Sequence, residues 1–214
     1  MIITTANWTE IAATLICTGC LLHKPSVINR WFVWFLWLTL SVELNGKLTT
    51  DMILVKYTVY NTFTLLEFAF YSGLFYQITR SKKSKFSIKV FFIPVLVFFI
   101  CNLIWGEGYE KYNGLTRCLT LLILTIYCLL YYTEAAKSDV VRNYKWGPFV
   151  IITGCFIFFT GNFVLALYFN YIAKNVPNDL VQLYRAINGN LAVFLYCMLS
   201  IGFLIEALAF FKKR

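Results

Sequence analysis

The 214-residue chain is 60% hydrophobic and 19% aromatic, and only 14% of its residues are charged. A soluble domain carries about 25% charged residues, so this composition excludes a water-soluble globular protein. The net charge of +9 comes from short basic clusters between apolar stretches. That pattern is typical of the cytoplasmic loops of membrane proteins and argues against a nucleic-acid partner.

Apolar stretches recur along the whole sequence. A membrane-spanning helix needs about 20 mostly apolar residues, and backbone groups in lipid must form their hydrogen bonds within the segment. We therefore predict one all-α domain over residues 1–214, a polytopic membrane bundle of about seven helices. The predicted spans lie near residues 5–22, 31–48, 53–79, 87–105, 114–135, 147–170 and 180–211.

Basic residues predict how the bundle is oriented. Most of the 19 Lys and Arg residues lie in four segments, 23–30, 80–89, 136–146 and 212–214, whereas the alternate loops are short and mixed in sign. Cytoplasmic loops carry the excess of Lys and Arg, so we expect the N-terminus outside and the C-terminus in the cytoplasm. The expected location is a bacterial inner membrane, with membrane lipids as neighbours.

Polar side chains form a stripe on the third predicted span. Spacings of three and four residues place them on one helical face: Tyr57, Tyr60, Asn61, Thr64, Glu67 and Tyr71. An acidic residue near mid-membrane costs about 2.5–3.5 kcal/mol on insertion scales. Glu67 is therefore expected to face the bundle interior, either protonated or paired with a cation.

Other predicted spans add polar residues between the midplane and the outer surface. Glu43 and Asn45 belong to the second span, and Arg117, Asn162 and Asn188 to later ones. We hypothesise an outward-facing polar cavity with Glu67 at its floor. Its candidate ligand-binding residues are Glu67, Asn61, Tyr60, Tyr57, Thr64, Arg117, Asn162, Tyr184, Arg185 and Asn188. The alternative is that the Asn and Tyr side chains join helices, each pair contributing about 0.6–2 kcal/mol.

Several chemistries lack the residues they require. The last predicted span has no Lys before Lys212 to hold retinal, and the single histidine, His23, lies at a loop edge. A histidine-based metal site and Ser-His catalysis are therefore not expected, and we predict no cofactor. Cys17 and Cys20 have the spacing of a redox pair, but their place toward the cytoplasmic end of the first span favours packing.

Two segments, Tyr60–Tyr71 and Thr160-Gly161-Asn162-Phe163, carry a resemblance. The chain resembles a group of uncharacterised seven-helix bacterial inner-membrane proteins, some of which occur beside histidine kinases. The resemblance implies a sensing role. That group is expected to have His just before the Asn of the last helix, whereas Ile187 precedes Asn188 here. The resemblance therefore does not imply a proton relay in this chain.

Seven spans, a polar cavity and no effector domain favour a receptor-like or sensor-like protein. It would bind a small or lipid-like ligand and signal to a separate cytoplasmic or membrane protein partner. One alternative is an enzyme acting on a lipid or isoprenoid, with Glu67 as acid or base and Arg117 or Arg185 holding an anionic head group. Others are a transporter, or a subunit of a membrane complex assembled through Trp31, Trp34 and Trp37.

Overall fold

A computed structural model describes residues 4–21, 27–48, 53–108, 110–137, 146–172 and 178–211. These ranges form α-helices and short connections, and no strand occurs within them. The helices are α1 (Thr5–Leu21), α2 (Val27–Leu48), α3 (Ile53–Ile78), α4 (Lys82–Trp105), α5 (Gly114–Lys137), α6 (Trp146–Ile172) and α7 (Asn178–Phe211). The predicted all-α class is confirmed.

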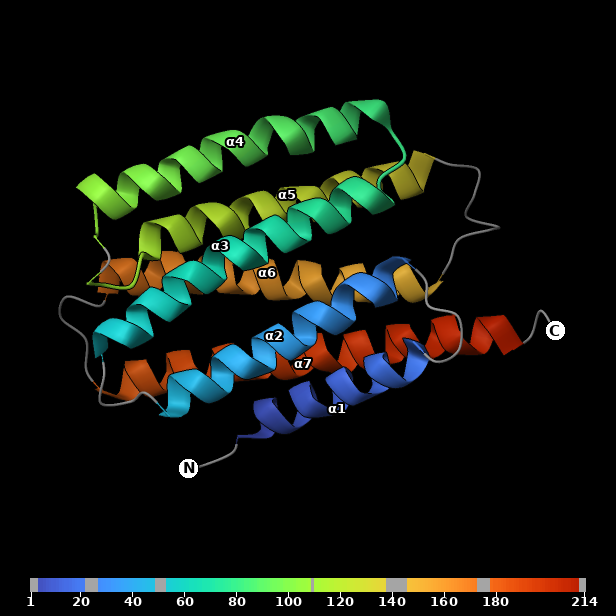
Figure 1. The fold of residues 1–214 in the computed structure, drawn as a ribbon, viewed down its shortest axis with the longest axis horizontal. Coiled ribbons are helices and arrows are strands. Elements are labelled where there is room, and N and C mark those ends of the chain that lie inside the picture. The colour runs from blue at the N-terminus through green and yellow to red at the C-terminus, as the bar shows by residue number, and fades with distance from the viewer. Residues whose placement is uncertain are drawn as a thin grey trace.

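Successive helices run in alternating directions. The C-terminal ends of α1, α3, α5 and α7 therefore lie together at one end of an elongated bundle (Figure 1). α7 packs against α1 and α6, α5 packs against α3, α4 and α6, and α2 lies against α1 and α3. This arrangement places α4 on the outside, in contact with α3 and α5.

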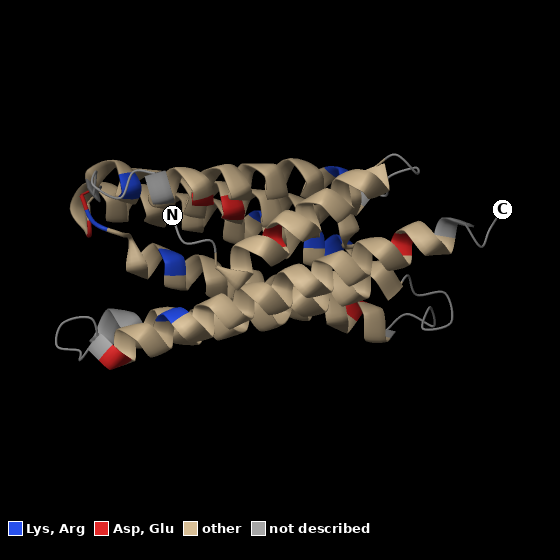
Figure 2. Cartoon of the chain, turned by 90° about the horizontal axis from the view of Figure 1, so that it is seen from below, with Lys and Arg blue, Asp and Glu red and all other residues tan. Residues whose placement is uncertain are grey.

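Within the described residues, four helices are long and apolar enough to cross a membrane: Lys82–Trp105, Gly114–Ala136, Trp146–Tyr168 and Asp179–Ala209. α7, for example, has no charged residue from 186 to 205, and long uncharged stretches are visible along the bundle (Figure 2). These four helices indicate an integral membrane protein. α1, at 17 residues, is short, and α2 and α3 carry more polar residues such as Glu43 and Glu67.

Glycines allow α6 and α7 to approach closely. Gly147, Gly154 and Gly161 recur every seven residues on α6. A Cβ atom added at Gly154 would lie 2.7 Å from Met198 Cβ, and one at Gly161 would lie 2.7 Å from Leu191 Cδ1. Small residues at a helix interface bring backbones together and increase van der Waals contact, so this spacing positions α7 against α6.

A carboxylate from α5 caps the start of α4. The Ser81 side chain makes no capping hydrogen bond. Instead, Glu134 accepts hydrogen bonds from the backbone N–H groups of Arg80 (2.9 Å) and Ser81 (3.1 Å). A negative charge at a helix N-terminus satisfies free N–H donors and complements the helix dipole. Glu134 therefore ties α5 to the connection between α3 and α4.

Candidate functional site

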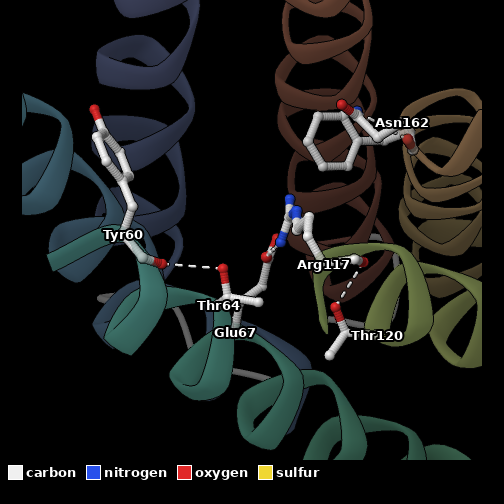
Figure 3. Close-up of polar contacts among 7 residues, drawn as sticks. Tyr60, Thr64, Glu67, Arg117, Thr120 and Asn162 are labelled. Carbon is white, nitrogen blue, oxygen red and sulfur yellow. Dashed lines mark hydrogen bonds and ion pairs between the residues drawn. The ribbon is translucent and has the colours of Figure 1, made fainter. Parts of the chain in front are cut away.

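Glu67 of α3 and Arg117 of α5 form an ion pair inside the bundle. Glu67 Oε2 accepts from Arg117 Nη1, and the two side chains point toward each other (Figure 3). The Glu67 side chain is 7% exposed and that of Arg117 is 16% exposed. The expected burial and pairing of Glu67 are therefore confirmed. Its partner, Arg117, belongs to α5 and lies 50 residues further along the chain.

A cavity of about 100 Å³ lies beside this ion pair. It is lined by residues from α5, α6 and α7 and from the α4–α5 connection: Tyr112, Gly114, Arg117, Leu121, Asn162, Ala166, Tyr184 and Asn188. Four of the predicted site residues, Arg117, Asn162, Tyr184 and Asn188, thus meet around one space. Arg117 belongs both to the cavity wall and to the ion pair.

The predicted floor of the cavity is different in the structure. Glu67 does not line the cavity, and it reaches the site through Arg117. Arg185, one residue from Tyr184, is exposed and is not among the lining residues. Adjacent residues on a helix point in directions about 100° apart, which explains why Tyr184 lines the cavity and Arg185 does not.

The remaining predicted residues of α3 lie outside the cavity lining. The Thr64 hydroxyl donates to the Tyr60 carbonyl at 3.0 Å (Figure 3). Tyr60 lies so close to Gly46 of α2 that a Cβ atom there would meet its hydroxyl. Tyr57 is half-buried. Tyr60 therefore contributes to the α2–α3 contact, and none of these three residues lines the cavity.

Asn61 holds a loop in place. Its amide nitrogen donates to the Lys111 carbonyl at 2.9 Å, and its side-chain oxygen accepts from the Asn113 N–H at 3.0 Å. Both partners belong to the connection that precedes α5. Asn61 therefore anchors the α4–α5 connection to α3.

The α4–α5 connection has its own polar network. The buried Asn102 donates to Glu107 Oε2 at 2.9 Å and to Thr116 Oγ1 at 3.0 Å, and it accepts from the Glu107 N–H at 3.3 Å. Glu107 in turn accepts from the Leu115 N–H at 3.2 Å, in the first turn of α5. The connection also needs Gly108, whose φ of +77° is costly for residues with a side chain. This network fixes the rim of the cavity next to Tyr112 and Gly114.

Asn102→Ala is expected to destabilise the chain by about 1–3 kcal/mol, because it leaves buried polar partners unsatisfied. Hydrogen exchange at the Leu115 amide should become faster as the rim loosens. In lipid nanodiscs, reversible unfolding measures the change in stability, and hydrogen–deuterium exchange measures the exchange rate of the Leu115 amide. Glu110→Gln, at an exposed position of the same connection, serves as control and should change stability by less than about 0.5 kcal/mol. Equal effects of the two substitutions would contradict a structural role for Asn102.

Sequence reasoning missed four lining residues: Tyr112, Gly114, Leu121 and Ala166. Leu121 and Ala166 each lie four residues after a predicted site residue, Arg117 and Asn162. Residues four apart share a helical face, so this spacing was the available signal. Tyr112 and Gly114 come from the connection before α5, whose path depends on Asn61 and Asn102.

The cavity is rich in groups that bind anions or polar molecules. An Arg guanidinium has five N–H donors in a planar fork, and Nη1 of Arg117 is the nitrogen that contacts Glu67. Tyr hydroxyls and Asn amides add further donors and acceptors. A volume of about 100 Å³ holds about three water molecules at roughly 30 Å³ each, or a small polar group of similar size.

Comparisons with protein-family models, curated proteins and solved structures find no match for this chain.

Proposed function

We propose that this chain is a receptor-like or sensor-like membrane protein that binds a small anionic ligand in the cavity beside Arg117. The observation that carries the proposal is the double position of Arg117, which lines the cavity and pairs with a carboxylate outside it. An anion in the cavity competes with Glu67 for the same guanidinium. Binding is thereby coupled to the contact between α3 and α5.

Cavity size favours a small ligand over a lipid. Sites for whole drug-sized molecules occupy about 300–1,000 Å³, whereas this cavity has about 100 Å³. A carboxylate, a phosphate or a similarly small group is compatible with that volume. Arg is well suited to such ligands because its planar fork matches carboxylate and phosphate oxygens.

The proposed topology has seven spans, with the N-terminus and the cavity mouth outside. The C-terminal ends of α1, α3, α5 and α7 share one end of the bundle (Figure 1), and α3 is followed there by Arg80, Lys82 and Lys83. The cavity lies toward the other end, near the start of α5. Exposed apolar residues on α2 and α3, such as Trp34, support placing these helices in lipid as well.

α5 provides a route for the signal. Arg117 and Glu134 lie near its two ends, and 17 residues at 1.5 Å each separate them by about 26 Å. Loosening of the Glu67–Arg117 pair allows α5 to move relative to α3, and the same helix carries the carboxylate that caps α4. We infer that a separate cytoplasmic or membrane protein partner detects the resulting change beside the basic start of α4.

The test is a thermal-stability screen of the chain in nanodiscs with phosphate, sulfate, acetate and succinate. At about 100 times its Kd, a bound anion should raise the Tm by about 5–10 °C. It should also speed hydrogen exchange at the Arg80 and Ser81 amides, because the cap formed by Glu134 loosens.

Ala166→Phe is the matched variant, because it fills the cavity and leaves Glu67 and Arg117 in place. Ala166→Phe should abolish both the rise in Tm and the faster hydrogen exchange at the Arg80 and Ser81 amides. The proposal fails if no anion of the panel stabilises the native chain, or if the stabilisation persists in Ala166→Phe.

A further inference from the structure

A second, larger concave surface lies on the outside of α2 and α3. This groove has a volume of about 600 Å³. Its apolar walls include Trp34, Leu38, Leu66 and Phe70, and Arg30 contributes a positive charge. It shares no residue with the cavity beside Arg117, so the two surfaces are independent.

The groove is built on a packed aromatic floor. The rings of Phe35 and Phe70 stack with centroids 4.0 Å apart. Trp31 packs against Gly73, where a Cβ atom would lie 3.0 Å from the indole ring. Ala69 precedes Phe70 in α3 and lines the groove. Because the Ala69 side chain is small, it leaves room in the groove that a larger residue would fill.

Several lining side chains face outward, whereas Phe35 is buried in the core. Trp34 is 80% exposed and Leu66 is 44% exposed, which is the exposure expected for side chains that contact hydrocarbon. Arg30 is also exposed, near the start of α2. Leu38 lies eight residues further along α2, which corresponds to about 12 Å of helix. The groove therefore runs from a positive charge into an apolar channel about two helical turns long.

We propose that this groove binds one anionic phospholipid from the cytoplasmic leaflet, with an acyl chain between α2 and α3 and the phosphate on Arg30. The guanidinium pairs with phosphate oxygens in a bidentate manner, and the nearby Trp side chains suit the head-group level of a bilayer. The proposal rests on the membrane placement of α2 and α3 and not on the ligand cavity.

The test is lipid retention by the full chain. The protein is reconstituted with equal amounts of phosphatidylglycerol and phosphatidylcholine, extracted in mild detergent and examined by native mass spectrometry. One phosphatidylglycerol should remain bound per chain. Arg30→Gln should lower its retention about tenfold, the change expected when a charge-assisted contact is lost.

Arg80→Gln is the matched control, because it removes the same charge at the same end of the bundle and does not line the groove. It should change retention by less than about twofold, the effect expected of a weak exposed charge. Ala69→Phe fills the groove and should remove the lipid while helical circular dichroism is unchanged. Equal retention of the two lipids, equal losses in Arg30→Gln and Arg80→Gln, or a lipid-free dimer would each overturn the proposal.

Discussion

Arg117→Gln is expected to destabilise the folded chain by about 3–5 kcal/mol, the cost of leaving one member of a buried ion pair without its partner. Glu67 loses its cation in this variant, and its side chain is 7% exposed. The carboxylate must then be protonated or remain buried with an uncompensated charge. Reversible unfolding in mixed lipid–detergent micelles measures the difference in unfolding free energy.

Glu67→Gln should cost less than Arg117→Gln, because the Arg117 side chain is more exposed, at 16%, and borders the cavity. The double variant should recover part of the loss, since neither charge is then left alone. Arg185→Gln, an exposed arginine outside the site, is the control and should stay within about 0.5 kcal/mol of the native chain. If Arg117→Gln were no more destabilising than Arg185→Gln, the ion pair would not stabilise the bundle.

Gly202→Ala is expected to destabilise the chain by about 1–3 kcal/mol, the usual cost of overpacking a well-packed interface. Gly202 lies in α7 where a Cβ atom would clash with Ile151 of α6 and lie 3.0 Å from the Gly147 carbonyl oxygen. The neighbouring atoms include backbone, so the clash is relieved only by moving the helices apart. Unfolding free energies in the same micelles provide the measurement.

Gly189→Ala is the control on the same helix, because a Cβ atom there would have nothing within 4 Å. Ala is a better helix former than Gly by about 1 kcal/mol, so this variant should be neutral or more stable than the native chain. A Gly202→Ala variant as stable as Gly189→Ala would show that close packing at Gly202 does not hold α6 against α7.

Helix boundaries show where hydropathy is informative. The apolar pattern predicts the fourth span near 87–105, whereas α4 begins at Lys82. Lys residues are good helix formers, so the helix extends past the apolar stretch, and Glu134 caps it there. Hydropathy identifies the apolar part of a helix that can lie in hydrocarbon. It does not identify the polar ends, whose positions depend on capping interactions.

The amino-acid sequence by itself determined the helical class, the apolar stretches and the burial of Glu67, because helix periodicity and the cost of charge in an apolar interior are local properties. Tertiary structure decided that Arg117 pairs with Glu67 and that Arg185 stays exposed. It also decided that Asn61 holds a loop and does not line the cavity. These outcomes depend on how each helix is rotated against its neighbours, which side-chain packing sets across the whole bundle.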